Sequence, residues 1–338
     1  MNKKIGLVIQ GPLLSIGRAG NNLHKSPGLL IKEGGVVEYD CRQNIQKIID
    51  EFGSLFDEII VSTWDKEVRP TDGWKGAKLI SVPDPGGIKQ TNSYKDNNKF
   101  RQFLSTLNGL KELEKSKIDV AVKIRTDQYL DLKLLLDSYH DKVENHPNPM
   151  AIGVTIAHPT TFLLHDLYFI ADLQALKRFC EAILSYARFE FISSVHREMM
   201  LKHAYKEYKD KINVSDSDYF PMNPPDGVSL GTRKIFDYMF RNVYVSLDPD
   251  VFRGTLWRGE YYEEDHVSRL VEVRGSVRKY NLPRLFTTDW DRYFNFRLQT
   301  YNTPISFIDK FIVKVGRLGW DIWNLIRKLG RKALSVVR

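Results

Sequence analysis

Short apolar runs and amphipathic segments alternate along the first 130 residues of the chain. Four runs have the length and composition of buried strands, over 5–10, 58–63, 77–82 and 119–124. The spacing of apolar residues between them predicts a helix over 40–52, capped by Asp40, and another over 98–113. Strands that alternate with helices are typical of a mainly parallel sheet flanked by helices. We therefore expect an α/β fold.

Polar residues lie where each of these strands ends. They are Gln10, Asp65, Asp84 and Asp127. In an open α/β sheet the ligand binds beyond the carboxyl ends of the strands. The pattern therefore predicts a nucleotide-type site within the first 130 residues.

The remaining segments are less regular. We expect loops over 13–36 and 215–227, a strand over 150–157, helices over 173–187 and 193–208, and short strands and turns over 244–290. No charged or Gly/Ser-rich linker divides residues 1–300, so we interpret them as one domain.

The composition is that of an ordinary soluble protein. Of the 338 residues, 42% are hydrophobic and 27% are charged, which argues against a disordered chain, a collagen-like chain and a small disulfide scaffold. The two cysteines, Cys41 and Cys180, lie far apart and fit no disulfide or zinc pattern, so a reducing compartment is expected.

No segment resembles a secretory signal or reaches the roughly 18 apolar residues of a membrane span. We expect a cytoplasmic protein that does not cross a membrane.

The net charge of +8 is concentrated at the end of the chain. Residues 305–338 contain eight basic and two acidic residues and so carry six of these charges, which leaves the remainder nearly neutral and argues against a nucleic-acid-binding body. Apolar residues of this tail recur at three- and four-residue steps, opposite the basic ones. A basic amphipathic helix of this kind, placed at 301–338, predicts association with an anionic membrane surface. The alternative is a terminal helix packed on its own domain.

Several catalytic motifs are absent from the sequence. It has no Gly-rich loop ending in Gly-Lys-Ser/Thr, no Gly-x-Gly-x-x-Gly after the first strand, no Gly-x-Ser-x-Gly and no His-Glu-x-x-His. A P-loop ATPase, a nicotinamide-dependent enzyme of the dinucleotide-binding fold, a serine hydrolase and a zinc peptidase are therefore not expected.

Five short stretches resemble the WavE lipopolysaccharide-synthesis family of bacterial proteins. They are Val8-Ile9-Gln10-Gly11-Pro12, Ile60-Val61-Ser62-Thr63-Trp64, Asp84-Pro85-Gly86, Arg101-Gln102-x-x-Ser105-Thr106-x-x-Gly109-Leu110, and Val122-Lys123-Ile124-Arg125-Thr126-Asp127. The order of the elements also resembles glycosyltransferases of the GT-A fold, in which a Rossmann-like half ends in an acidic metal-binding motif. The resemblance implies a nucleotide-binding half at 1–130 and an acceptor half at 131–300. It also implies transfer of a sugar from a nucleotide-sugar donor to a lipopolysaccharide core, capsule or other lipid-linked glycan acceptor, at the inner face of the cytoplasmic membrane.

Asp127 is the candidate metal ligand under this resemblance. A Mn²⁺ or Mg²⁺ ion held by a carboxylate neutralises the charge that develops on a diphosphate leaving group. GT-A enzymes usually have Asp-x-Asp here, whereas this chain has Arg125-Thr126-Asp127. Either Asp127 binds the metal with a later residue such as Asp166, or Arg125 and nearby basic groups replace the metal as a phosphate clamp. We favour the metal, while a turn-capping role for Asp127 is the structural alternative.

The other strand-end residues are candidates for the nucleotide. Gln10, Gly11, Pro12, Trp64 and Asp65 would line the base pocket, with Trp64 as a stacking face. Core packing is a strong alternative for Trp64.

Asp84 and the start of the second helix are candidates for the donor as well. Asp84 is either a nucleotide-site residue or only part of a turn. Arg101 and Gln102 would face the donor, with Arg101 on the diphosphate, although a plain surface position is its alternative. Asn98 would contact the sugar or cap the helix.

An inverting transferase needs a general base for the acceptor hydroxyl. Asp166, beside His165, is the preferred candidate and Glu198 the second, ahead of the acidic residues at 263–265.

Two other functions compete with glycosyl transfer. One is transfer of a sugar phosphate, and the other is a non-catalytic membrane-associated adaptor. Sugar nucleotidyltransferases are disfavoured, because Gln10-Gly11-Pro12-Leu13-Leu14 stands where they carry a Gly-rich loop with an arginine.

Overall fold

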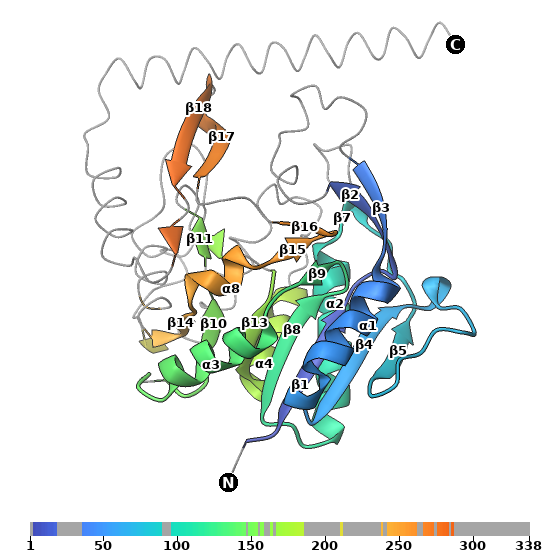
Figure 1. Ribbon diagram of the computed structural model, residues 1–338. Helices are drawn as coiled ribbons and strands as arrows, with labels where there is room; N and C mark the ends of the chain where they lie inside the picture. Colours follow the sequence, from blue (N-terminus) through green and yellow to red (C-terminus); the bar gives the residue numbers. More distant parts are fainter. Residues whose placement is uncertain are drawn as a thin grey trace, which may run out of the picture.

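A seven-stranded sheet forms the centre of the protein (Figure 1). The computed structural model describes residues 3–18, 36–89, 96–146, 148–154, 156–158, 163–164, 167–185, 210–211, 238, 242–261, 266–273, 276–283 and 285–286. The strands of the sheet, in spatial order, are β14 (Tyr244–Ser246), β10 (Ile152–Val154), β13 (Phe169–Asp172), β8 (Val120–Arg125), β1 (Ile5–Gln10), β4 (Glu58–Trp64) and β5 (Lys78–Val82). Neighbouring strands are parallel except at β13, which is antiparallel to both β8 and β10. The expected mainly parallel α/β sheet is confirmed.

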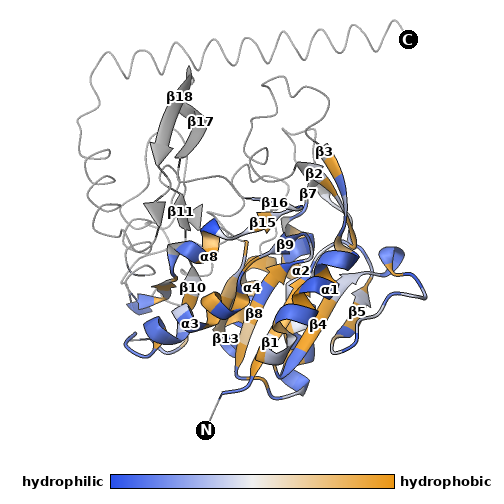
Figure 2. Cartoon of the chain, viewed as in Figure 1, coloured by the Kyte–Doolittle hydropathy of each residue, from blue (hydrophilic) through white to orange (hydrophobic). Residues whose placement is uncertain are grey.

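Helices cover both faces of this sheet, and apolar strands lie between the more polar helices (Figure 2). The helices α1 (Cys41–Phe52) and α3 (Leu132–Val143) share one apolar core with Leu7 and Ile9 of β1. The helices α2 (Lys99–Lys115) and α4 (Leu173–Leu184) pack together on the opposite face, where Val8 points. This alternation follows from the two-residue period of a strand.

Smaller elements stand around the central sheet. The two-stranded ribbons are β2 (Leu14–Arg18) with β3 (Val36–Asp40), β6 (Ile88–Lys89) with β7 (Asp96–Asn97), and β17 (His266–Val273) with β18 (Ser276–Pro283). One three-stranded sheet has the spatial order β12 (Leu163–Leu164), β11 (Ile156–His158) and β19 (Leu285–Phe286). A second has the order β16 (Glu260–Tyr261), β15 (Leu256–Trp257) and β9 (Gln128–Tyr129). Among the described residues, the other short elements are η2 (Gly53–Leu55), η3 (Asp65–Glu67) and α8 (Pro249–Arg253). Because β9 directly follows the turn after β8, its pairing with β15 brings residues 256–261 to the carboxyl end of the central sheet.

Most of the expected elements in the first half are confirmed, with ends that move by one or two residues. The loop expected over 13–36 is wrong at 14–18, which forms β2. In β2 the apolar residues face solvent and the polar residue faces inward, the reverse of the usual pattern. Leu14 and Ile16 are 39% and 65% exposed, while Ser15 is buried. The single strand expected over 150–157 is also wrong, because the chain passes from β10 in the central sheet to β11 in another sheet. The helix expected over 173–187 is confirmed but already ends at Leu184.

Some expectations fall outside the described residues. They are the helix over 193–208, the loop over 215–227, and the amphipathic tail at 301–338. Within the described part of the chain, no helix has the length and apolar content needed to cross a membrane. The division into a domain at 1–300 and a tail stays a prediction.

Candidate functional site

The carboxyl ends of β4, β1 and β8 are tied together by backbone and side-chain hydrogen bonds. The Gly11 N–H donates to the Ser62 carbonyl at 3.1 Å, and the Thr126 N–H donates to the Gln10 carbonyl at 3.0 Å. The Thr126 hydroxyl also donates to the Pro12 carbonyl at 2.7 Å. Gly11 has a φ of +138°, and a Cβ atom there would lie 2.7 Å from Thr126 Oγ1. Only glycine fits this approach of the two strand ends.

Asn44 of α1 fixes the turn that follows β8. Its buried amide donates to the carbonyl of Thr126 at 2.8 Å and to that of Gln128 at 2.7 Å. This residue was not among the sequence-predicted site residues. The signal was present, since Asn44 interrupts the apolar face of α1 beside Cys41 and Ile45.

Asp127 lies at the centre of this turn, with its side chain fully buried at 0% exposure. Arg125 donates to both carboxylate oxygens, from Nε to Oδ1 at 2.9 Å and from Nη2 to Oδ2 at 3.1 Å. Arg258 Nη2 lies 3.0 Å from Oδ2, and the Ser15 hydroxyl donates to the same oxygen at 2.7 Å. Both oxygens of the carboxylate are therefore engaged by donors of this chain.

The charge state of Asp127 follows from these contacts. Burial by itself raises the pKa of the carboxyl group, but Arg125, Arg258 and the Ser15 hydroxyl outweigh burial and lower the pKa to about 2. Asp127 is thus an anion at neutral pH, and a carboxylate with so low a pKa, whose oxygens already accept from these donors, is a weak proton acceptor.

Arg258 reaches Asp127 from a tight hairpin between β15 and β16. Arg258 and Gly259 form the two-residue turn, with φ values of +50° and +83°. Positive φ at both central residues is what a type I′ turn requires, and Asn-Gly is the preferred pair. A left-handed conformation costs an ordinary L residue roughly 1–2 kcal/mol. Arginine at this position therefore carries a conformational penalty that its side-chain contacts must offset.

Those contacts fix both the backbone and the guanidinium of Arg258. Its N–H donates to the Asp127 carbonyl at 2.9 Å, and its Nε donates to Ser15 Oγ at 3.0 Å. A Cβ atom at Gly17 would lie 3.0 Å from the guanidinium, so the β2 strand is packed against it. The ring of Trp257 lies 4.7 Å from Arg125 Cζ and 5.7 Å from Arg258 Cζ, at cation–π distances.

A second charged cluster lies beyond β5. Arg101 donates from Nε and Nη2 to the two Asp84 oxygens, each at 2.6 Å, and Lys66 pairs with the same carboxylate. The Gly86 N–H donates to Asp84 Oδ1 at 2.9 Å. Burial raises the pKa of Asp84, yet these donors bring it down to about 2. Asp84 is therefore both a turn residue and the centre of an ion-pair cluster.

Asn98 belongs to this cluster as well. It stands before α2 without a side-chain cap hydrogen bond, and its Oδ1 accepts from Arg101 Nη1 at 3.0 Å. Arg101 is thus fixed by two side chains rather than standing as a plain surface residue.

The two clusters are separated by the width of the sheet between them. β5 and β8 are the outer members of the row β5, β4, β1, β8, so three inter-strand spacings separate them. At about 4.8 Å each, the strands lie roughly 14 Å apart. The clusters at Asp84 and Asp127 are thus placed to contact different parts of an extended ligand.

Three of the predicted nucleotide-site side chains lie in the interior. Gln10 Oε1 accepts from the Ser105 hydroxyl of α2 at 2.8 Å, and Gln102 and Trp64 are buried. Core packing is therefore the role that the structure gives Trp64. Asp65, in contrast, is exposed in η3, and Pro12 is half-buried. Their nucleotide-binding roles stay predictions.

The remaining predicted site residues, Asp166, Glu198 and the acidic residues at 263–265, lie outside the described residues. Across the described ranges, no group of three or more His, Cys, Asp and Glu residues is arranged to hold a metal ion. A divalent cation does not fit Asp127 as it stands, because guanidinium and hydroxyl donors already engage both oxygens.

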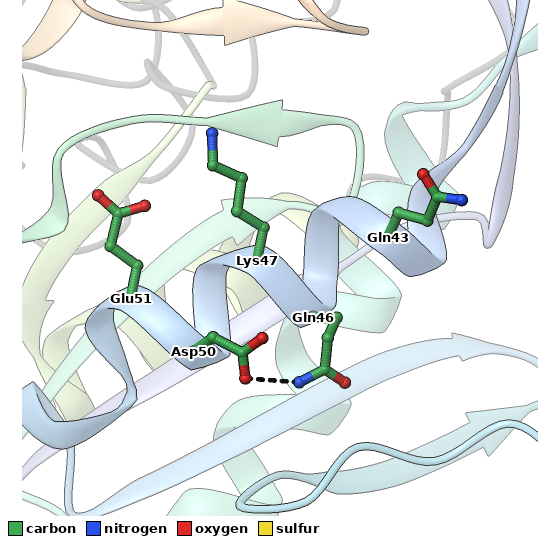
Figure 3. A pocket seen from close by; sticks show the side chains of 5 residues that line it. All are labelled: Gln43, Gln46, Lys47, Asp50 and Glu51. Carbon is green, nitrogen blue, oxygen red and sulfur yellow. Dashed lines mark hydrogen bonds between the residues drawn. The ribbon is translucent and has the colours of Figure 1, made fainter.

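A shallow groove of about 530 Å³ lies on the outer side of α1 (Figure 3). Its lining residues are Gln43, Gln46, Lys47, Asp50 and Glu51. Lys47 Nζ lies 3.9 Å from the centre of the Tyr129 ring, and the Tyr129 hydroxyl donates to Glu51 at 2.5 Å. None of the strand-end residues lines this groove, so it is separate from the two charged clusters.

Comparison with known proteins gives one family match. The family model described as WavE lipopolysaccharide synthesis matches residues 5–168. No curated protein matches the chain.

Solved structures give only distant similarities. A mannose-1-phosphate geranyltransferase from Thermus thermophilus has 12% identity and a TM-score of 0.31, over 56% of this chain and 66% of its own. A 4-diphosphocytidyl-2C-methyl-D-erythritolsynthase from Anaerococcus prevotii has 13% identity and a TM-score of 0.30, over 57% and 81%. A cytidylyltransferase from Leptospira borgpetersenii serovar Hardjo-bovis has 13% identity and a TM-score of 0.32, over 62% and 74%. Such similarities are too distant to carry information on substrate or chemistry.

Proposed function

We propose that this chain, whose residues 5–168 match the model of the WavE lipopolysaccharide synthesis family, is a glycosyltransferase. It would move a sugar from a nucleotide-sugar donor to a lipopolysaccharide core, capsule or other lipid-linked glycan acceptor. One observation carries the proposal beyond the family match. Charged side chains converge at the carboxyl ends of parallel strands, at Asp84 beyond β5 and at Asp127 beyond β8, which is where open α/β sheets bind their ligands.

The spacing of the two clusters suits an elongated donor. A nucleotide-sugar has a base and ribose at one end and a diphosphate and sugar at the other. We assign the Asp84–Arg101 cluster to the nucleoside end, in place of the diphosphate role expected for Arg101, and the Arg125–Asp127 cluster to the diphosphate end. The separation of roughly 14 Å between β5 and β8 suits contact of the two clusters with opposite ends of such a donor.

The transfer itself exchanges one bond for another. The acceptor hydroxyl oxygen forms a bond to the anomeric carbon of the sugar while the bond from that carbon to the β-phosphate oxygen breaks. The hydroxyl proton passes to a base, and the nucleoside diphosphate leaves with the electron pair. Asp166 and Glu198 stay the candidates for the base, because Asp127, with a pKa of about 2, does not fit that role.

Binding of one nucleotide to the full-length protein is the first expected result. We expect one of UDP, GDP, dTDP and CMP to raise the melting temperature, because a ligand that binds only the folded state stabilises it by about 2.7 kcal/mol at a hundred times its Kd. The measurement is thermal unfolding with each nucleotide, with Mn²⁺ and with EDTA. Adenosine diphosphate serves as the matched control for nonspecific phosphate binding. If no nucleotide shifts the transition, the donor assignment is wrong and a non-catalytic adaptor becomes the better proposal.

The products distinguish glycosyl transfer from its alternatives. Incubation of the nucleotide-sugar with an acceptor should release nucleoside diphosphate. From a nucleoside-diphosphate sugar, release of nucleoside monophosphate would indicate transfer of a sugar phosphate, and release or consumption of pyrophosphate would indicate nucleotidyl transfer. A CMP-linked sugar, in contrast, releases CMP on glycosyl transfer itself.

Membrane association through residues 305–338 is a separate part of the proposal. We expect the full chain to sediment with anionic vesicles and a chain ending at residue 304 to stay in the supernatant, because the tail carries six of the eight net positive charges. Neutral vesicles are the control, and the interaction should weaken at high salt. Equal sedimentation of both chains would assign the tail to packing on its own domain.

A further inference from the structure

We infer that Arg258 is a diphosphate-binding residue which, together with Arg125, does the work that a divalent cation at Asp127 was expected to do. This inference rests on the proposed function and names the part of the site that recognises the donor phosphates. Arg258 lies outside the residues matched by the family, which end at 168.

The first step is the occupancy of the Asp127 carboxylate. Its Oδ1 accepts from Arg125, and its Oδ2 accepts from Arg125, Ser15 and Arg258 at 2.7–3.1 Å. A metal ion would have to displace at least one of these donors from a side chain with 0% exposure. The guanidinium groups of Arg125 and Arg258 therefore occupy the positions next to the carboxylate oxygens that a bound cation would need.

The second step is the chemistry of the two arginines. A guanidinium carries five N–H donors in a rigid plane, so it is able to contact a carboxylate and a phosphate together. Arg125 is 19% exposed and Arg258 is 9% exposed, while Asp127 behind them is fully buried. A ligand that approaches from the carboxyl edge of the sheet therefore meets the guanidinium groups and not the carboxylate.

The third step is the fixed orientation of Arg258. Its guanidinium lies beside Ser15 of β2, Asp127 of the turn after β8 and the ring of the preceding residue, Trp257. Donors that are oriented before the ligand arrives lose little entropy on binding. Asp127 is, in this arrangement, a positioning residue for two phosphate-binding arginines.

The fourth step is the backbone of the turn. Position 258 has a φ of +50°, which asparagine adopts more readily than arginine, and Gly259 follows it. A residue that served only the turn would be asparagine or glycine. The presence of arginine against this preference indicates that the side chain has a use.

The same turn supplies a variant for the test. Arg258→Asn removes the guanidinium but gives the preferred Asn-Gly pair for a type I′ turn, so the hairpin is expected to remain folded. Arg253→Asn is the matched control, because Arg253 is exposed on α8 and pairs with Asp250 at 2.7 Å. Arg258→Lys, which keeps the charge but loses the planar fork, is the second variant.

The experiment measures affinity by calorimetry for the nucleoside diphosphate that binds the wild-type protein and for the matching monophosphate. Both are titrated in EDTA and in Mn²⁺. We expect equal diphosphate affinity with and without metal. Arg258→Asn should weaken diphosphate binding about 10- to 100-fold, as expected for loss of a charged hydrogen bond, and should weaken monophosphate binding less. Arg258→Lys should fall between the two, and Arg253→Asn should match the wild type.

The outcomes separate this inference from the proposed function. Diphosphate binding that EDTA abolishes and Mn²⁺ restores would overturn the inference and leave the glycosyltransferase proposal standing. Unchanged affinity in a folded Arg258→Asn protein, or wild-type binding to a monophosphate alone, would also overturn it. Failure of the wild type to bind any nucleotide would instead remove the proposed function itself.

Discussion

Replacement of Asp127 by asparagine is expected to lower the free energy of unfolding by about 2–5 kcal/mol at pH 7. The amide keeps the shape of the carboxylate but removes its charge, so Arg125 and Arg258 lose the anion buried between them. Urea unfolding of the two proteins measures the difference. Asp137→Asn is the matched control, because its ion pair with Lys133 is exposed on α3 and should contribute less than about 1 kcal/mol.

The same substitution should change the pH dependence of stability. The pKa of Asp127 in the folded protein is about 2, below the ordinary value of 3.8 for an aspartate in water. A lowered carboxyl pKa gives stability that is present above the unfolded pKa and is lost as pH falls through the folded pKa. Between about pH 5 and pH 2 the wild type should therefore lose about 2 kcal/mol that the asparagine variant lacks from the start. Parallel curves for the two proteins would show that Asp127 does not carry this charge.

Substitution of Gly11 by alanine is the second change with a large expected effect. The φ of +138° disfavours any residue with a Cβ atom, which costs about 1–3 kcal/mol, and the contact of 2.7 Å with Thr126 Oγ1 adds about 1–3 kcal/mol of overpacking. The variant should unfold at a lower urea concentration and should lose nucleotide binding, because Thr126 directly precedes Asp127.

Gly73 provides the control for this glycine. It has no positive φ, and a Cβ atom there would meet nothing within 4 Å. Gly73→Ala should stay within about 0.5 kcal/mol of the wild type. If Gly11→Ala proves as stable as Gly73→Ala, the strand ends of β1 and β8 are not as closely joined as their hydrogen bonds indicate.

The central strands and two helices of the first half were predictable because local signals agreed. Apolar runs gave β1, β4, β5 and β8, and Asp40 capped α1 as expected, with its side chain accepting from the Arg42 N–H. The helix α3 was missed although Asp131 caps it and Leu132, Leu135, Leu136 and Tyr139 repeat at helical spacing. The antiparallel direction of β13 has no local signal, because a strand carries the same apolar residues in either direction.

The candidate site was predictable only where its residues are close in sequence. Arg125 and Asp127 follow one strand and were identified together. Ser15 and Arg258 are 243 positions apart, and only the folding of two separate ribbons onto the end of β8 brings their side chains to 3.0 Å. The metal role expected for Asp127 illustrates this limit, because Ser15 and Arg258, two of the three side chains that engage its carboxylate, lie far from it in the sequence.

The long separation between Asp127 and Arg258 also sets an order of events during protein synthesis. A ribosome that adds about 5–20 residues per second needs roughly 7–26 s to pass from the codon for Asp127 to that for Arg258. During that interval the nascent chain has Arg125 but not the hairpin that closes the turn. β14, the edge strand beside β10, also emerges late. Assembly of the cluster around Asp127 is therefore a late step of biogenesis, and early chain termination would leave an anion without one of its two counter-charges.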